Sequence, residues 1–468
     1  MTMPAAAFSL SESLLQRFRD IAGADNVVTK DESLEKLSKD FYWYSPVLKR
    51  QLEDKRADFA VKVDSLEVLR QVISLACTER IPVCLRGGGT GNYGQLIPLY
   101  GGLLLDISGM DRILSLEGGF ARTEPGARLF KIEAEANAVG YELRCMPSTW
   151  VKSSMGGFLA GGSGGIGSIT WGGISHGDNM VSLTLLTVEA EPRVLRFEGT
   201  DCFKALHTYG TNGIIIESEM RLAPRRDYDQ LIVSHEDWDT LFAWTDDFAH
   251  QTDIPKRLVT AFEWPVPSYF LPLKKHLSEG KQVSFALVDQ GHTEAVVASA
   301  EAAGLEVNFN QPWPNPPKPP YITDYTWNHT TLWALKVDPT ITYLQLGFGD
   351  EGYVEKMKKM KERFPEEFFH HLEWTISRPK IEWDNSTVNV GGLPIIFHKS
   401  EERLQEIMDY AVSIGGFLAN PHTYFLEEGG LHPDIEAKRQ LKADVDPAGI
   451  LNPGKMKTYA DNPFATVS

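Results

Sequence analysis

Short apolar runs and helical patterns alternate in the first part of the chain. The run Phe59–Val63 is followed by apolar residues at helical spacing over Leu66–Ala76, and then by the run Val83–Leu85. Short runs rich in β-branched and aromatic residues are typical of strands, whereas a period of about 3.6 residues is typical of an amphipathic helix. The pattern therefore predicts a strand-helix-strand unit. Apolar positions over Leu10–Ile21 predict an earlier helix.

A second alternating pattern begins after Pro224. The apolar run Leu231–Val233 precedes a helical stretch over Trp238–Phe248, and Val283–Val288 precedes another over Glu294–Ala303. Strands that alternate with helices predict a second α+β layer structure.

Three further helices are expected over Tyr353–Phe364, Glu401–Ser413 and Ile435–Leu441. Between the expected helices Glu294–Ala303 and Tyr353–Phe364, the segment Gln311–Pro320 holds six prolines in ten residues. Proline fixes its own φ angle and lacks an N–H donor, so this segment is expected to be extended, polyproline-like and on the surface.

Length, composition and charge narrow the class of protein. The 468 residues exceed the usual size of one domain, and 42% apolar with 23% charged residues is typical of a soluble enzyme. The net charge of −17 repels phosphate backbones and anionic lipids, so nucleic acid and membrane surfaces are poor partners. No stretch approaches the length of a membrane span, and the start lacks the features of a secretory signal. We therefore expect a cytoplasmic protein with reduced, mostly buried cysteines.

Glycine clusters are the strongest chemical signal. The segment Arg86–Gly94 has five glycines in nine residues directly after a predicted strand. Such a loop can present several backbone N–H groups to one anion, although a tight structural turn would have the same composition. A second cluster over Ser153–Gly167 and a third turn over Tyr209–Ile215 follow. Two such loops suit a pyrophosphate, and the apolar third turn suits a flat nucleotide ring.

These segments resemble the FAD-linked oxidase family, of the vanillyl-alcohol oxidase and p-cresol methylhydroxylase (PCMH) type. The resemblance rests on Leu85–Thr90 for the first loop, Ser154–Gly165 for the second, Asp178–Leu183 for a strand entry and Gly210–Ile215 for the adenine-side turn. Near the end, Asp446–Lys455 is similar to the ending of the subgroup that oxidises glycolate and D-lactate.

The resemblance implies an α+β fold with a two-subdomain, PCMH-type FAD-binding unit and an α+β cap domain over the flavin. The expected division is an N-terminal helical segment (residues 1–50), the FAD-binding domain (51–226), the cap or substrate domain (227–415) and a C-terminal segment that returns to the flavin site (416–468). Members that attach FAD covalently through the first loop carry His where this chain has Thr90. FAD is therefore expected to be bound non-covalently.

The resemblance also implies a set of cofactor-binding residues. They are Arg86, Gly87, Gly88, Gly89, Thr90, Gly91, Asn92, Tyr93, Pro147, Ser148, Ser154, Gly156, Gly157, Gly161, Gly164, Gly165, Gly213, Ile215 and Asn452. No metal is expected, because the stretches that match the subgroup's metal motifs read Leu346–Glu351 and Asn420–Thr423. The adjacent pair His370 and His371 is interpreted as a surface helix end.

Oxidation of an alcohol by flavin needs a base, and His422 is the first candidate because it lies where the subgroup has its Glu-His-Gly turn. A satisfied loop histidine would have the same sequence. His329, in an aromatic segment, and Tyr424 are the other catalytic candidates, while Glu373 and Lys336 are weaker candidates for orienting groups. The substrate-binding candidates are Tyr325, Trp327 and Arg378; the last could pair with a substrate carboxylate, or be solvated.

The function expected from these features is a flavin-dependent oxidase or dehydrogenase. Its substrate is a small hydroxyl-bearing molecule, either an aromatic alcohol or a 2-hydroxy acid, and its electron acceptor is oxygen or another oxidant. The alternative is a non-redox use of the same fold, such as an ether-forming synthase or a silent nucleotide-binding scaffold. A homodimer is compatible with the sequence.

Overall fold

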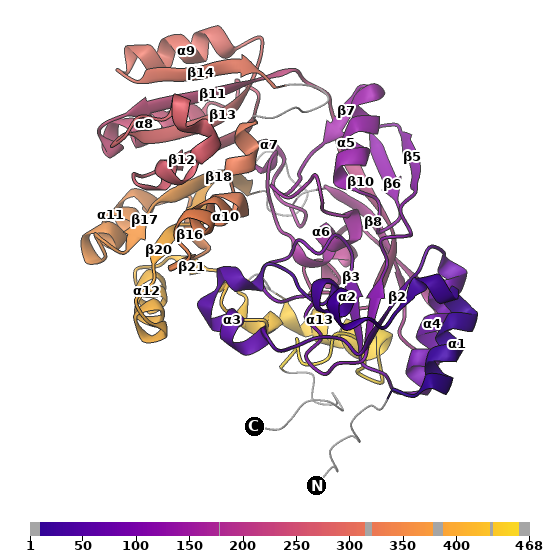
Figure 1. The fold of residues 1–468 in the computed structure, drawn as a ribbon. Helices are drawn as coiled ribbons and strands as arrows, with labels where there is room; N and C mark the ends of the chain where they lie inside the picture. The colour runs from indigo at the N-terminus through magenta and orange to yellow at the C-terminus, as the bar shows by residue number, and fades with distance from the viewer. Residues whose placement is uncertain (1–9, 177, 314–320, 378–386, 431–433, 458–468) are drawn as a thin grey trace.

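The computed structural model describes residues 10–176, 178–313, 321–377, 387–430 and 434–457. Figure 1 shows two layered parts, an indigo-to-magenta part that contains the glycine loops and a magenta-to-orange part that faces it. The arrangement confirms the expected α+β architecture with a second layered unit. The four cysteines are free, as the sequence predicts.

The first sheet contains the predicted strand-helix-strand unit. Its strands run in the order β1 (Val27–Val28), β2 (Phe59–Lys62), β4 (Leu103–Asp106) and β3 (Val83–Arg86). Both β2 and β3 pair in parallel with β4, and α4 (Leu66–Thr78) crosses between them. The hydroxyl of Ser65 caps α4 by accepting from the Val68 N–H. Helices α1 (Glu12–Ala22), α2 (Asp31–Leu37) and α3 (Pro46–Leu52) belong to the same part.

The second sheet is antiparallel. Its strand order is β5 (Ile113–Glu117), β6 (Phe120–Thr123), β10 (Ile214–Pro224), β8 (Met180–Leu186) and β9 (Val194–Glu198), and β7 (Tyr141–Leu143) pairs with the end of β10. Helices α5 (Leu129–Ala138), α6 (Met155–Gly161) and α7 (Ser168–Trp171) lie between this sheet and the second part of the molecule.

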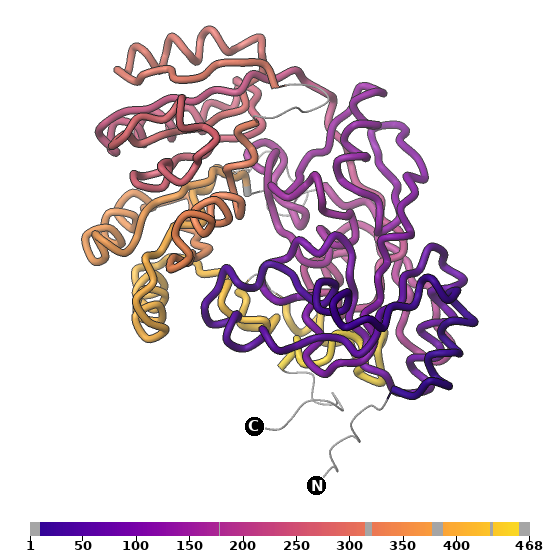
Figure 2. Tube along the Cα trace, in the orientation of Figure 1, coloured from indigo at the N-terminus to yellow at the C-terminus, as the bar shows by residue number. Residues whose placement is uncertain are grey.

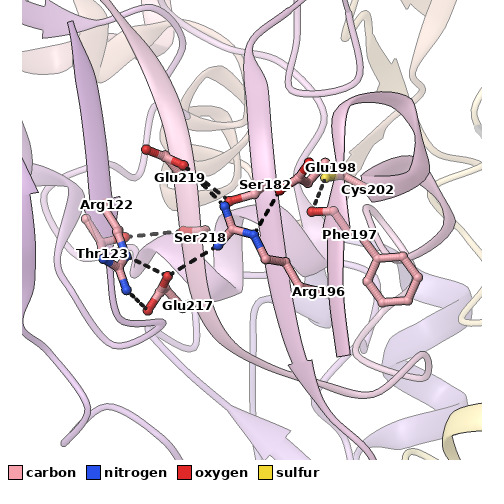
Figure 3. Close-up of polar contacts among 10 residues, drawn as sticks. All are labelled: Arg122, Thr123, Ser182, Arg196, Phe197, Glu198, Cys202, Glu217, Ser218 and Glu219. Carbon is pink, nitrogen blue, oxygen red and sulfur yellow. Dashed lines mark hydrogen bonds and ion pairs between the residues drawn. The ribbon is translucent and has the colours of Figure 1, made fainter. Parts of the chain in front are cut away.

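One face of the second sheet is polar and open to solvent (Figure 3). Arg122 of β6 forms two hydrogen bonds with Glu217 of β10, at 2.6 and 2.9 Å, and Arg196 of β9 contacts Glu198 at 3.1 Å and Glu219 at 3.7 Å. Alternate residues of the same strands, such as Met220, are buried. Since side chains alternate between the two faces of a strand, the face with the charged residues is the solvent side and the core lies on the opposite face. Each of these exposed ion pairs contributes at most about 1 kcal/mol to stability.

The large sheet of the second part is antiparallel. Its order is β14 (Glu306–Pro312), β11 (Tyr228–His235), β13 (Gln282–Asp289), β12 (Lys256–Phe262), β18 (His371–Ser377), β19 (Thr387–Gly392), β16 (Leu346–Gly349) and β21 (Phe417–Leu418). One face packs against α8 (Trp238–His250), α9 (Thr293–Ala302), α11 (Tyr353–Arg363) and α12 (Glu401–Ser413). The other face shares a core with α10 (Asn328–Val337) and with α5 and α6 of the first part.

Smaller elements complete the described chain. A short sheet has the order β15 (Ile341–Tyr343), β20 (Ile395–Phe397) and β17 (Phe368–Phe369). The 3₁₀ helices are η1 (Ala24–Asn26), η2 (Tyr42–Tyr44), η3 (Gly199–Lys204), η4 (Val266–Tyr269), η5 (Leu271–His276), η6 (Ile322–Tyr325) and η8 (Leu426–Glu428). Among the described helices, none combines the length and apolar character needed to cross a bilayer.

The end of the chain returns to the first part (Figures 1 and 2). Helix α13 (Ile435–Val445) precedes a segment whose Ile450 carbonyl accepts from the Val83 N–H at 2.8 Å. The Asn452 N–H in turn donates to the Val83 carbonyl at 2.7 Å. The C-terminal segment thereby extends the edge of β3, directly before the first glycine loop.

Two sequence interpretations need correction. The proline-rich segment is not wholly polyproline-like, because Gln311 and Pro312 end β14; residues 314–320 lie outside the described residues. His370 and His371 are not at the surface: they are 2% and 0% exposed, at the junction of β17 and β18.

Candidate functional site

A cavity of about 370 Å³ lies between the two parts of the molecule. The glycine loops after β3 and around α6 line it from one side, and residues of β16, β18, β19 and the start of α10 line it from the other. Its size is within the range of about 300–1,000 Å³ that is usual for ligand sites.

The two glycine loops are joined by a serine and a threonine. The Ser154 hydroxyl accepts from the Gly88 N–H at 3.2 Å and from the Gly157 N–H at 3.4 Å, and the Thr90 hydroxyl lies 2.8 Å from the Ser153 hydroxyl. A Cβ atom on Gly88 would come within 2.6 Å of the Lys152 carbonyl oxygen. Glycine is therefore required there by the close approach of the two backbones.

Most of the cofactor-binding residues expected from the sequence line this cavity. They are Gly87, Gly88, Gly89, Thr90, Gly91, Asn92, Tyr93, Pro147, Ser148, Ser154, Gly156, Gly157, Gly161, Gly164, Gly213, Ile215 and Asn452. Asn452 comes from the C-terminal segment, so residues far apart in the sequence meet at one wall.

Arg86 and Gly165 do not belong to the lining. The Arg86 guanidinium points back to the N-terminal segment and donates to the carbonyl oxygens of Leu37 and Lys39, at 2.5 and 3.2 Å. A Cβ atom on Gly165 would meet the Met146 carbonyl oxygen at 2.0 Å, so another backbone segment packs closely against this glycine. The expected role of both residues as cofactor contacts stays a prediction.

A buried acid and a buried amine lie beside the first loop, and sequence reasoning missed both. Asp40 lines the cavity, is 5% exposed and has an Oδ2 atom without a hydrogen-bond partner. Burial raises the pKa of Asp40 to about 6, against the lowering effect of the Lys455 ammonium. Lys455 is fully buried and donates to the Gly94 carbonyl at 2.5 Å.

His422, the first candidate for the base, does not line the cavity. Its Nδ1 lies 2.8 Å from the Ser45 hydroxyl and its Nε2 lies 2.9 Å from the Tyr343 carbonyl oxygen. Burial lowers its pKa to about 4, so the ring is neutral near pH 7. The histidine joins α3 to β15, and the expected catalytic role is not supported.

The other sequence candidates divide between packing positions and the cavity. His329 is turned toward Asp324, with its Nδ1 3.8 Å from the carboxylate, and Tyr325 is buried and stacks on Trp333; neither lines the cavity. Tyr424 also lies outside the lining, beside Lys455. Arg378 lies outside the described residues.

The cavity wall of β18 carries a carboxylate and an imidazole. Residues 371, 373 and 375 share one face of the strand because side chains alternate, and Leu372 and Trp374 point into the core on the opposite face. Glu373 lines the cavity and is 2% exposed. Its Oε1 atom lies 2.9 Å from the His371 Nε2. Glu373, a weaker candidate for an orienting group in the sequence, is therefore part of the cavity wall.

The Glu373 carboxylate also holds the backbone of Trp327. The Trp327 N–H donates to Glu373 Oε1 at 2.7 Å. Trp327 has a φ of +53°, a conformation that costs a non-glycine residue about 1 kcal/mol or more. This hydrogen bond fixes the turn before α10, and Trp327 is part of the cavity lining. Its expected role in substrate binding stays a prediction.

Within the described residues, no group of three or more His, Cys, Asp or Glu side chains is arranged to hold a metal ion. The two stretches compared with metal motifs have other roles: residues 346–349 form β16, and His422 joins two elements as described. Of the histidine pair, His370 stacks on Trp238 with ring centroids 5.4 Å apart.

Replacing His422 by Ala is expected to lower stability rather than activity. The change leaves the Ser45 hydroxyl and Tyr343 carbonyl buried without this partner, at a cost of about 1–3 kcal/mol. Because the folded-state pKa of about 4 lies below the usual 6.5, the stabilisation by His422 is present above pH 6.5 and is lost as the pH falls toward 4. Chemical denaturation of both proteins across this range measures the difference. A variant of unchanged stability whose flavin reduction is slow would restore the catalytic interpretation.

This chain is similar in sequence to known proteins. Residues 57–196 match the family model described as an FAD binding domain. An uncharacterized FAD-linked oxidoreductase of Mycobacterium tuberculosis is 25% identical, over 94% of this chain and 97% of the relative. The glycolate oxidase subunit GlcD of Escherichia coli is 23% identical, over 83% of this chain and 81% of the relative.

Among solved structures, an alkyldihydroxyacetonephosphate synthase superposes with a TM-score of 0.71, at 15% identity, over 97% of this chain and 88% of the synthase chain. At this identity the similarity concerns the fold alone. The matched domain agrees with the glycine motifs around the cavity and shows an FAD-binding domain over residues 57–196, and the chain is similar over nearly its full length to FAD-linked oxidoreductases.

Proposed function

We propose that this protein oxidises the CH–OH group of a small molecule, with Glu373 as the base that accepts the hydroxyl proton. The observation that carries the proposal is the buried carboxylate of Glu373 on the cavity wall that faces the glycine loops, supported by His371 at 2.9 Å. Alcohol oxidation needs a hydride acceptor and a base on one substrate, and the two walls supply the places for both.

The glycine-loop wall fits FAD. Glycine residues of both loops line this wall, so the main chain itself borders the space for a pyrophosphate without side chains in between. Residues 147–148 and 161–164, together with Gly213, Ile215 and Asn452, continue the wall for the remainder of the dinucleotide. When bound, FAD supplies the group that accepts the hydride.

Burial prepares Glu373 to act as a base. Desolvation raises the pKa of the carboxyl, which strengthens it as a proton acceptor, while the hydrogen bond from His371 opposes the rise. The ring nitrogens of His371 face the Glu373 carboxylate and the Leu393 carbonyl oxygen, the latter at 3.2 Å. Glu373 takes the proton from the substrate oxygen. His371 holds the carboxylate in place through the contact between its Nε2 and Glu373 Oε1.

The proposed donor class, compounds with a CH–OH group, rests on the pair of Glu373 and His371, which can accept a hydroxyl proton. In addition, one relative is named for glycolate. Aromatic alcohols and 2-hydroxy acids are the two classes to test, against the alternative of a non-redox, ether-forming use of the fold. An anaerobic panel of both classes should bleach the yellow flavin with at least one member. Flavin that stays oxidised with every hydroxyl compound, but is bleached by dithionite, would exclude the proposed oxidation.

Acid precipitation of the purified protein is expected to release the flavin into the supernatant. Thr90 stands at the position where covalent members carry His, and its hydroxyl is directed to Ser153. The absorbance spectra of pellet and supernatant measure the partition. Flavin that stays with the polypeptide would show a covalent link.

Activity is expected to survive exhaustive treatment with EDTA, because the proposed proton transfer uses Glu373 and needs no metal ligand. Flavin reduction rates before and after chelation provide the measurement. Loss of activity that zinc or manganese restores would contradict this prediction.

A further inference from the structure

We propose that the substrate of this site is an elongated molecule, with its CH–OH group at Glu373 and an apolar far end at Phe417. Its middle crosses two glycines, Gly391 and Gly347. This inference rests on the proposed function, since it names the substrate class of the same site. It follows from the register of four neighbouring strands, β18, β19, β16 and β21, and from the exposure of the residues that these strands place in the cavity wall.

Four residues of the cavity lining form one row across the large sheet. Glu373 of β18 is paired with Gly391 of β19. Gly391 is paired in turn with Gly347 of β16, and Gly347 with Phe417 of β21. Directly paired residues of antiparallel strands are on the same face of the sheet. The face that presents Glu373 to the cavity therefore also presents Phe417, and the whole row lies on the wall opposite the glycine loops.

The middle of the row has no side chains, because both positions are glycine. At Gly391 the neighbouring strand requires this, since a Cβ atom would come within 2.8 Å of the Leu346 carbonyl oxygen. At Gly347 a Cβ atom would lie 3.5 Å from the Phe417 Cβ, an ordinary contact, and the residue does not have a positive φ. Glycine inside a strand weakens it and often marks a place where a ligand approaches the backbone. The row thus leaves room for a ligand between its two ends.

The row runs from a buried end to an exposed end. Glu373 is 2% exposed, whereas Phe417 is 51% exposed and belongs to the last strand in the order of the sheet. Adjacent strands are about 4.8 Å apart, so three spacings separate the two side chains by roughly 14 Å. A molecule as short as lactate cannot contact both ends. The spacing suits a longer substrate whose reacting end is buried at Glu373.

Phe417 determines the chemistry of the far end. Its ring is half open to solvent and belongs to the cavity lining, so a ligand that packs on it removes apolar surface from water. An aromatic ring or an alkyl chain of the substrate makes this contact. A charged far end would instead lose hydration without a gain from the ring.

Matched pairs of short and long alcohols test the inference with the flavin-loaded protein. Benzyl alcohol is compared with 4-phenylbenzyl alcohol, and lactate with 2-hydroxydecanoate, so both donor classes have a member that reaches toward Phe417. The second-order rate constant of anaerobic flavin reduction should be at least roughly tenfold larger for the long member of any pair that reacts, because its added apolar group is buried. Comparable rate constants, or faster reduction by the short member, would overturn the inference and leave the proposed oxidation standing. Flavin that no member reduces would overturn both.

The Phe417→Ala variant tests the far end directly, because it removes the ring from an exposed position. The ratio of the long to the short rate constant should fall toward one, mainly through a higher KM for the long member. Phe130→Ala is the matched control, since Phe130 is a 37% exposed phenylalanine outside the cavity lining, and it should keep the parental ratio. A parental ratio in Phe417→Ala as well, or an equal loss of rate for both members, would contradict the inference.

Discussion

Glu373→Gln is expected to slow flavin reduction by roughly 10²–10⁴-fold, the usual contribution of a general base, while FAD content stays near normal. Gln keeps the shape of the side chain and an oxygen to accept the Trp327 N–H, so the turn before α10 should persist. It cannot take a proton from the substrate. Stopped-flow reduction under anaerobic conditions measures the rate, and absorbance measures the bound flavin.

The pH profile gives this prediction a second readout. Because burial raises the Glu373 pKa, wild-type flavin reduction should rise with pH through an ionisation above the usual range of a glutamate, as the carboxylate form becomes populated. The variant should lack this ionisation. Glu263→Gln is the control, since Glu263 is a partly buried glutamate of the same part that pairs with Lys361 at 2.6 Å and lies outside the cavity lining. Reduction by Glu373→Gln at the parental rate would remove Glu373 from the mechanism.

Gly88→Ala is expected to weaken FAD binding by roughly ten- to hundredfold, with partial loss of cofactor on purification. The added methyl would lie 2.6 Å from the Lys152 carbonyl oxygen and 3.0 Å from the Ser153 Cα, both main-chain atoms that cannot move alone. Overpacking of this kind typically costs about 1–3 kcal/mol, and it would separate the two loops that line the cavity. Titration of apoprotein with FAD, followed by flavin fluorescence, measures the affinity.

Gly291→Ala is the matched control for Gly88→Ala. Its added methyl would meet only a side-chain oxygen of Asp289, at 3.1 Å, in a turn of the second part. FAD affinity should be unchanged in this variant. Parental affinity in Gly88→Ala as well would reduce the first glycine loop to an ordinary turn.

The glycine-loop wall of the cavity was predictable from the sequence, because a cluster of glycines is compatible with few kinds of local structure. A cluster such as Gly87–Gly91 after a strand must turn, and it leaves backbone N–H groups accessible whatever the rest of the fold is. Arg86 and Gly165 lie outside the cavity lining, and their side-chain or Cβ directions are set by segments distant in the sequence. Such directions cannot be read from local composition.

The catalytic wall was harder to predict. The short turn around His422 suggests a base, but the environment of the ring is set by Ser45 and Tyr343, which lie far away in the sequence. Glu373 has a local signal of its own. The segment His371–Ser377 alternates polar and apolar residues, which is typical of a strand with one polar face, and a glutamate on such a face belongs either to solvent or to a site.

A primary deuterium isotope effect tests the central claim most directly. The substrate is a reactive alcohol from the panel, deuterated at the carbon that bears the hydroxyl, and the measured quantity is the anaerobic rate of flavin reduction. Hydride transfer from that carbon predicts slower reduction with the deuterated alcohol, in the wild type and also in the slow Glu373→Gln variant. Flavin reduction at the same rate with both isotopes in both proteins would contradict CH–OH oxidation as the reaction of this site.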